Sequence, residues 1–106
     1  PRASRVPVSA SNSAAEIIVE GSVQGVGFRD YAQRRGSRLG LAGYVMNLRD
    51  GRVRARVEGV RARIEEFVRE LEKGPPLSRV ERVGVRWLPT TGRYAAFEVR
   101  YAEFEP

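Results

Sequence analysis

A short glycine-rich bend that ends in an arginine holds the residues of this sequence best suited to bind an anion. Residues 24–28 read Gln-Gly-Val-Gly-Phe, and Arg29 follows directly. Glycines allow the backbone angles that turn several N–H groups into one concavity able to hold a phosphate. The planar guanidinium of Arg29 can grip two phosphate oxygens at once. These residues predict a phosphate site. A glycine-rich turn that binds nothing, beside a solvated arginine, would have the same sequence pattern.

The bend does not match the common nucleotide-binding motifs. Asp30 stands where the dinucleotide fingerprint needs its third glycine, and no Gly-Lys-Ser/Thr of a P-loop is present. The helix predicted to begin at Phe28 has no Ser, Thr, Asp or Asn directly before it as a cap. A bound anion could satisfy the free N–H groups of its first turn, and Gly27 is itself an acceptable cap.

Asn47 is the second candidate for chemistry. It lies at the end of a strand-like run in which Tyr44, Met46 and Leu48 point to the opposite face. Asparagine is depleted in strands, and its amide can both donate a hydrogen bond to a water molecule and accept one from it. The alternative is that Asn47 only starts the following hairpin loop, as asparagine often does. The residues alone leave both interpretations open.

The composition excludes several kinds of chemistry. The chain has no cysteine and no histidine, which rules out disulfides, thiolate nucleophiles and the commonest metal ligand and general base. The 13 carboxylates show no compact metal-ligand spacing, so we expect no metal ion. The formal charge is +6, with 18 arginines and one lysine, which favours anionic partners unless the arginines serve only solubility and ion pairing.

The elements that must position these residues follow from the apolar periodicity. At 106 residues the chain is predicted to form one domain, covering 15–106, behind a mobile tail of residues 1–14. Apolar alternation predicts strands over 15–23, 83–87 and 97–101 and a hairpin over 43–59 that turns at Asp50-Gly51. Helical spacing predicts helices over 28–39, stopped by Gly40, and over 60–71, stopped by Gly74-Pro75-Pro76.

This order of elements predicts an α+β fold. The sequence β-α-β-β-α-β, with one short C-terminal strand added, suits a ferredoxin-like split βαβ sandwich. Two helices then cover one face of a mostly antiparallel sheet. Because enzymes, metal carriers and RNA-binding domains all use this fold, it does not identify a function.

Two long motifs in the chain resemble the signatures of the acylphosphatases, small ferredoxin-like enzymes that hydrolyse the carboxyl–phosphate anhydride. Residues 19–29, Val-Glu-Gly-Ser-Val-Gln-Gly-Val-Gly-Phe-Arg, are similar to the first signature. The second is similar to residues 43–47, Gly-Tyr-Val-Met-Asn, together with Gly51, Val53 and Gly59. The closing Phe-Glu-Val-Arg-Tyr of residues 97–101 is similar to the last strand of the family.

The resemblance implies a role for each matching residue. It implies that Arg29 binds the substrate phosphate with the backbone amides of Gln24, Gly25, Val26, Gly27 and Phe28. It implies that Asn47 positions the attacking water. The expected substrate is a small acyl phosphate, with inorganic phosphate as product and inhibitor and no cofactor. We further expect a cytoplasmic monomer that binds neither membrane nor nucleic acid.

Two other functions remain as alternatives. A basic nucleic-acid-binding module of the same fold could use Arg52, Arg54 and Arg56 on the open sheet face. RNA-binding domains of this kind place stacking aromatics on their central strands, whereas this strand offers Arg and Glu. The second alternative is an acylphosphatase-like domain fused to a larger carbamoyl-transfer maturation protein, although a free-standing enzyme is the simpler interpretation.

Overall fold

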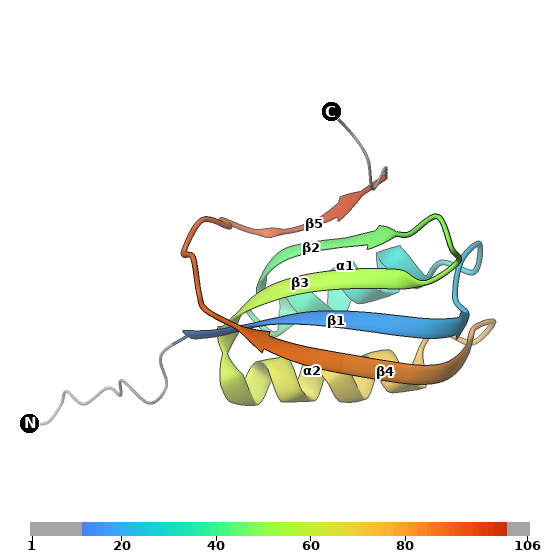
Figure 1. Cartoon of the computed structure of the whole chain (residues 1–106), viewed down its shortest axis with the longest axis horizontal. Helices are drawn as coiled ribbons and strands as arrows, with labels where there is room; N and C mark the ends of the chain where they lie inside the picture. Colours follow the sequence, from blue (N-terminus) through green and yellow to red (C-terminus); the bar gives the residue numbers. More distant parts are fainter. Residues whose placement is uncertain (1–11, 102–106) are drawn as a thin grey trace, which may run out of the picture.

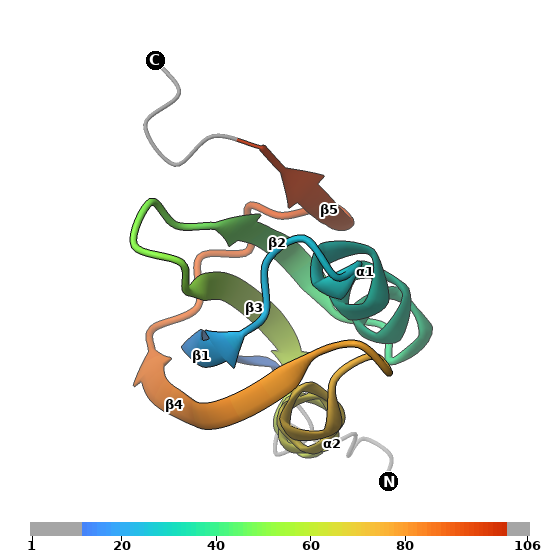
Figure 2. The same cartoon turned by 90° about the vertical axis from the view of Figure 1, so that its right-hand side faces the viewer.

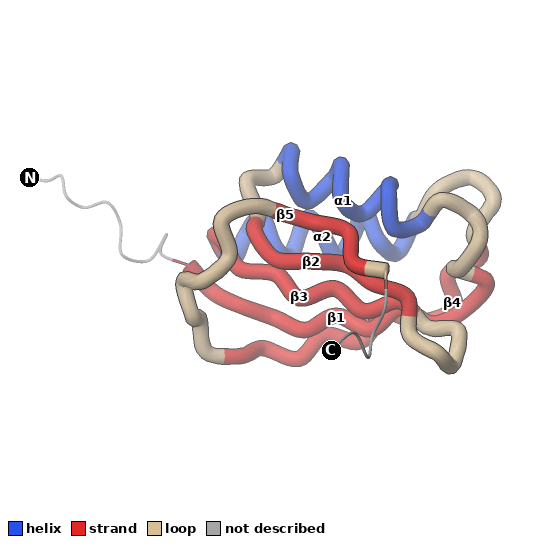
Figure 3. The backbone as a smooth tube through the Cα atoms, turned by 90° about the horizontal axis from the view of Figure 1, so that it is seen from above, coloured by secondary structure: helices blue, strands red, loops and turns tan. Residues whose placement is uncertain are grey.

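The computed structural model describes residues 12–101, which form a five-stranded sheet with two helices packed on one of its faces (Figures 1 and 3). The sheet order is β4-β1-β3-β2-β5, and only β2 and β5 pair in parallel. This arrangement confirms the predicted α+β, ferredoxin-like fold. The elements in chain order are β1 (Asn12–Ser22), α1 (Phe28–Arg38), β2 (Ala42–Asn47), β3 (Val53–Val60), α2 (Arg61–Lys73), β4 (Arg79–Leu88) and β5 (Phe97–Arg100).

Strand β1 begins three residues earlier than the sequence predicted. Ala14, which the prediction placed in the tail, is fully buried and pairs with Glu58 of β3 and Leu88 of β4. The two neighbouring strands extend far enough to supply hydrogen-bond partners, and this tertiary pairing overrides the weak strand preference of Asn12 and Ser13. Residues 1–11 of the predicted tail and residues 102–106 of the predicted domain lie outside the described residues.

Helix α1 ends where the sequence predicted. Gly40 adopts the left-handed conformation at φ 74°, which lets its N–H donate to Ser37 O over 3.0 Å. The N–H of Leu41 donates to Gly36 O over 2.9 Å, which completes a Schellman motif. Within residues 12–101, neither helix has the length and apolar content needed to cross a membrane.

The β2–β3 hairpin is also confirmed, with a loop longer than a two-residue turn. The loop closes through the N–H of Leu48, which donates to Arg52 O over 2.8 Å. Only Gly51 takes a positive φ, at 97°, while Asp50 uses its carboxylate to accept the N–H of Arg52 over 3.1 Å. This backbone hydrogen bond is the main reason why the pKa of Asp50 lies below its ordinary value.

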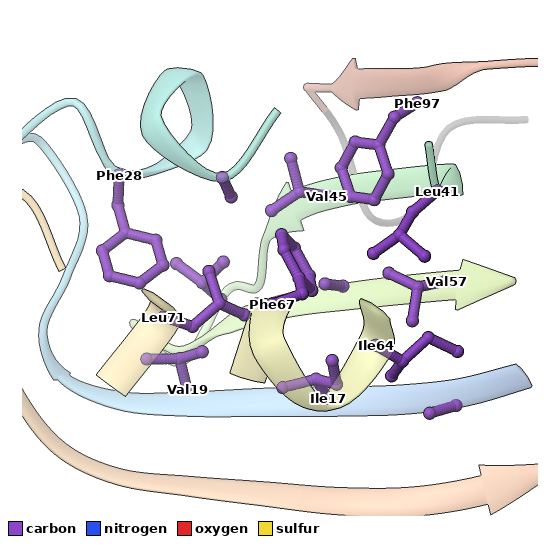
Figure 4. Packing of buried hydrophobic residues seen from close by; sticks show 14 of the residues in the cluster. Ile17, Val19, Phe28, Leu41, Val45, Val57, Ile64, Phe67, Leu71 and Phe97 are labelled. Carbon is purple, nitrogen blue, oxygen red and sulfur yellow. The ribbon is translucent and has the colours of Figure 1, made fainter. Parts of the chain in front are cut away.

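The hydrophobic core lies between the sheet and the helices (Figure 4). Phe67 of α2 stands at its centre, with its ring edge-to-face against Phe97 of β5 at 5.5 Å between centroids. Phe28, at the first position of α1, is 2% exposed and packs into the same cluster. The first turn of α1 is therefore fixed to the core at the residue directly before Arg29.

Glu58 alternates with the arginines of β3 along the strand, yet its carboxylate is buried. Residues 89–96 cross from β4 at one edge of the sheet to β5 at the other, past the end of β3 (Figure 1). The buried Glu58 carboxylate accepts hydrogen bonds from the N–H and hydroxyl of Thr91 and the N–H of Gly92, at 2.8–3.2 Å. The crossing segment covers this carboxylate, which the strand alternation could not reveal.

Candidate phosphate-binding site

The predicted site residues of the bend and of β2 meet at one end of the sheet, where a cleft of about 250 Å³ opens beside the first turn of α1. Figure 2 views the molecule from this end, where the β1–α1 bend, the β2–β3 hairpin and β5 lie near one another. The predicted residues that line the cleft are Gly25, Gly27, Phe28, Arg29 and Asn47. Four residues that were not predicted as part of the site also line the cleft: Val23, Asp30, Val99 and Tyr101.

The backbone of the bend has the alternation expected of an anion-binding concavity. Gly25 and Gly27 take left-handed conformations at φ 76° and 80°, while Val26 between them does not have a positive φ. Such alternation points successive N–H groups toward one side of the chain. A Cβ atom at either glycine would meet no atom of the described part of the chain within 4 Å, so glycine is required for the backbone angle and not for space.

The N-terminus of α1 opens directly into this concavity. Gly27 is its N-cap residue, and no side chain among residues 12–101 caps the helix there. The first N–H groups of a helix have no intrahelical partner, and the helix dipole favours negative charge at this end. The bend and the helix together can therefore donate several hydrogen bonds to one tetrahedral anion.

Arg29 supplies the positive charge of the cleft. Its side chain is half-buried, and its Cζ atom lies 4.8 Å from the ring centroid of Tyr101. In the part of the chain that the structure describes, no carboxylate forms an ion pair with Arg29. The guanidinium is thus held beside the concavity without a competing anion from residues 12–101.

Asn47 is the last residue of β2, and its side chain lies on the helix-covered face, two residues after the buried Val45. Its Oδ1 atom is buried and has no hydrogen-bond partner among the described residues. A buried acceptor without a donor is costly, and Asn47 is one of the residues that line the cleft. This observation favours the water-positioning interpretation of Asn47 over a role limited to starting the hairpin.

Gln24 and Val26 were predicted to contribute to the phosphate site, and their side chains do not line the cleft. Val26 packs against the core. The Nε2 atom of Gln24 donates to Leu48 O over 2.7 Å and to Arg52 O over 2.9 Å, which ties the bend to the hairpin. Any contribution of these two residues to anion binding must come from their backbone N–H groups.

Sequence reasoning missed the wall of the cleft formed by Val99 and Tyr101. Both residues were predicted only as alternating positions of the last strand, and the pattern gave no sign that they face Arg29. The parallel pairing of β5 with β2, in register from Gly43↔Phe97 onward, brings this strand to the cleft. In the sequence, Asp30 was considered only because it stands where the dinucleotide fingerprint needs a glycine. In the structure it also borders the cleft.

The open face of the sheet offers a poor surface for nucleic acid. Glu16 lies 3.0 Å from the guanidinium of Arg86 and 3.9 Å from that of Arg54, so part of the basic charge is paired within the protein. Tyr44 on this face is covered by the guanidinium of Arg100, whose Cζ atom lies 4.0 Å from the ring centroid.

Within residues 12–101, no group of three or more His, Cys, Asp or Glu side chains could hold a metal ion.

Comparison with known proteins points to one family. The sequence model of the acylphosphatase family matches residues 15–99. An acylphosphatase of Anaeromyxobacter dehalogenans is 51% identical over 87 residues, which cover 82% of this chain and 94% of that protein.

Solved structures give the same result. The crystal structure of acylphosphatase from Bacillus subtilis has a TM-score of 0.81 and 36% identity, and the match covers 84% of this chain and 99% of that one. Full-length HypF, solved in its phosphate- and nucleotide-bound form, matches 92% of this chain with only 12% of its own, at a TM-score of 0.77 and 31% identity.

Proposed function

The chain belongs to the acylphosphatase family and hydrolyses the carboxyl–phosphate anhydride of acyl phosphates, and we propose that Arg29, the amides of residues 24–28 and Asn47 perform this reaction. One observation carries the proposal. A cation, an amide concavity and Asn47, whose buried Oδ1 has no hydrogen-bond partner among residues 12–101, all border a single cleft. These are the groups needed to hold a phosphoryl group and to orient a water molecule beside it.

Binding comes first. The phosphoryl group lies in the concavity formed by Gly25 and Gly27 at the N-terminus of α1, and the guanidinium of Arg29 contacts two of its oxygens. Both sets of donors are fixed before the substrate arrives, because Phe28 is buried and the glycines hold the required angles. Preorganised donors of this kind stabilise the charge that develops on the phosphoryl oxygens in the transition state.

Attack by water follows. Asn47 Oδ1 accepts a hydrogen bond from the water and directs its oxygen toward phosphorus, in line with the bond to the acyl oxygen. That phosphorus–oxygen bond breaks as the new one forms, and the acyl group leaves as a carboxylate. An amide is too weak a base to remove the proton, so the proton passes to the phosphate or carboxylate of the substrate itself.

This mechanism needs no protein nucleophile and no metal ion. Inorganic phosphate, the product, fits the same concavity and should inhibit by competing with the substrate. The proposed working unit is a monomer, which a measurement of molecular mass in solution tests. Its proposed location is the cytoplasm.

The test is hydrolysis of benzoyl phosphate in the presence of a metal chelator. Wild-type protein should turn over the substrate and be inhibited by inorganic phosphate. Arg29→Ala should lose phosphate binding together with at least about 10³-fold in kcat/KM, because it removes the main charge on the transferred group. Asn47→Ala should keep the inhibition constant of phosphate and lose about 10²-fold in kcat, because it removes only the orientation of the water.

Each result can contradict a separate part of the proposal. Full activity of Asn47→Ala would remove the water-positioning role while leaving the phosphate site in place. Activity that disappears with the chelator and returns with added metal would contradict the metal-independent mechanism. Arg34→Ala, an exposed arginine of α1 outside the cleft, is the matched control for loss of one positive charge and should behave as wild type.

A further inference from the structure

Gln24 makes a connection that the phosphate site itself does not explain. Its carboxamide Nε2 donates to two carbonyl oxygens, Leu48 O at 2.7 Å and Arg52 O at 2.9 Å. These carbonyls belong to the two ends of the hairpin loop, and they also accept N–H groups from within that loop. The side chain of Gln24 therefore joins the first residue of the phosphate bend to both sides of the hairpin base.

The hairpin base is directly adjacent to the residue that orients the water. Leu48 follows Asn47 in the chain, and Arg52 precedes Val53, the residue that pairs with Asn47 in the sheet. Leu48 is 8% exposed, so this end of the hairpin is anchored in the fold. A bond that fixes Leu48 O relative to Gln24 consequently fixes the start of the bend relative to Asn47.

The relative position of these two segments matters for the reaction. The bend holds the phosphoryl group, whereas Asn47, on a different strand, holds the water. In-line attack requires the water oxygen and phosphorus to keep a defined distance and direction, and a misplacement of about 1 Å can cost on the order of 10²-fold in rate. Two hydrogen bonds between the segments restrict such a displacement.

From this geometry we infer that the side chain of Gln24 is a positioning residue, which sets Asn47 in register with the bound phosphoryl group. The inference rests on the proposed roles of Arg29 and Asn47. It assigns Gln24 a second function besides its backbone N–H, since its side chain does not line the cleft. Loss of the carboxamide should lower kcat and leave phosphate binding nearly intact, because the bend and Arg29 stay in place.

The variant that tests this is Gln24→Met, which keeps the length of the side chain and removes both donors. We expect kcat for benzoyl phosphate to fall about tenfold, with the inhibition constant of inorganic phosphate changed less than about twofold. Amide hydrogen exchange at Leu48 and Gly51 should become faster, which reports the loosened hairpin without any use of activity.

Gln33→Met is the matched control. The Gln33 carboxamide also donates to a distant carbonyl, Phe97 O at 3.2 Å, and to Ser37 Oγ at 3.0 Å, and Gln33 does not line the cleft. This variant should lose a comparable amount of stability and keep the kcat of the wild type. A loss of kcat in Gln33→Met equal to that in Gln24→Met would show a general effect of stability and overturn the inference.

A double-mutant cycle with Asn47→Ala separates this inference from the proposed function. If Gln24 acts through Asn47, Gln24→Met should reduce kcat in the wild type and have almost no further effect in Asn47→Ala. Equal effects in both backgrounds, or no effect of Gln24→Met alone, would overturn the positioning role while leaving the function of Asn47 intact. An Asn47→Ala enzyme with full kcat would instead overturn the water-positioning role, and the inference with it.

Discussion

The guanidinium of Arg29 lies over the ring of Tyr101, with 4.8 Å between Cζ and the ring centroid. Tyr101 is 75% exposed, and it stands just beyond β5, the strand that pairs with β2 beside the cleft. The contact therefore links the positive charge of the site to the C-terminal edge of the sheet. It restricts the arginine through its ring contact, and no hydrogen bond within residues 12–101 occupies the guanidinium donors.

Removal of the Tyr101 ring should weaken substrate binding. An exposed cation–π contact contributes about 0.5–1 kcal/mol, so Tyr101→Ala should raise KM for benzoyl phosphate by about two- to fivefold. Tyr101→Phe retains the ring and should keep the KM of the wild type. Steady-state kinetics of the two variants check this, and equal values of KM in Tyr101→Ala and wild type would show that the ring does not hold Arg29.

The left-handed angle at Gly25 should be essential to the concavity. Gly25→Ala places a Cβ in open space but at φ 76°, which costs an L residue about 1–2 kcal/mol. We expect a lower free energy of unfolding and weaker phosphate inhibition. Gly84→Ala is the control, because a Cβ there also meets nothing within 4 Å and the backbone has no such positive φ. Similar phosphate inhibition in both variants would contradict the role of the angle.

Glu58 should make the stability of the protein depend on acid. Burial raises the pKa of its carboxyl, but hydrogen bonds from Gly92 and Thr91, together with Arg56, outweigh this effect and hold the pKa below its ordinary value of 4.5. Because the folded pKa is lower than the unfolded one, the stabilisation is complete above about pH 4.5 and is lost as the pH falls through the folded value.

The variant Glu58→Gln should therefore be less stable than wild type at neutral pH, by about 2 kcal/mol, since hydrogen bonds to a charged group become bonds to a neutral one. The difference should shrink at acidic pH, where wild-type Glu58 is protonated. Urea unfolding at several pH values measures it, with the exposed Glu98→Gln as control. A constant difference across the pH range would show that charge on Glu58 does not hold the crossing segment.

Gly36 should tolerate no side chain, although it lies within α1. A Cβ at this position would lie 2.8–3.1 Å from three atoms of the Phe97 ring, which is buried against Phe67. Overpacking of about 1–3 kcal/mol should exceed the gain of about 1 kcal/mol that alanine gives a helix, so Gly36→Ala should lower the melting temperature. In a Phe97→Leu background the same change should cost less, and an undiminished cost there would exclude the clash.

Most of the fold could be predicted from local pattern. Ile64, Phe67 and Leu71 recur at helical spacing and are all fully buried, and Val53, Ala55 and Val57 alternate along β3 with the same result. Such periodicities follow from the geometry of one element and need no knowledge of its neighbours. The start of β1 was wrong by three residues because strand length depends on the partners β3 and β4, which lie far away in the chain.

The candidate site was predictable in part for the same reason. Gly25, Gly27 and Arg29 are close in sequence, so their spacing predicts an anion site at a helix N-terminus, with a plain glycine-rich turn as the alternative. Asn47 joined the prediction through resemblance to a family, since its residue type and position left two interpretations open. Nothing local indicated that Gln24 reaches across to the hairpin or that Glu58 is buried under Thr91 and Gly92.

The sequence by itself determined the type and order of the elements, the glycines of the bend and the charge of Arg29, because each depends on residue type and on neighbours within a few positions. Only the tertiary structure decided that Asn47, Val99 and Tyr101 share one cleft with Arg29. Those contacts come from sheet pairing, above all the parallel register of β2 with β5. The distance between residues of different strands depends on how those strands pair. The residue types near each position in the sequence do not specify that pairing.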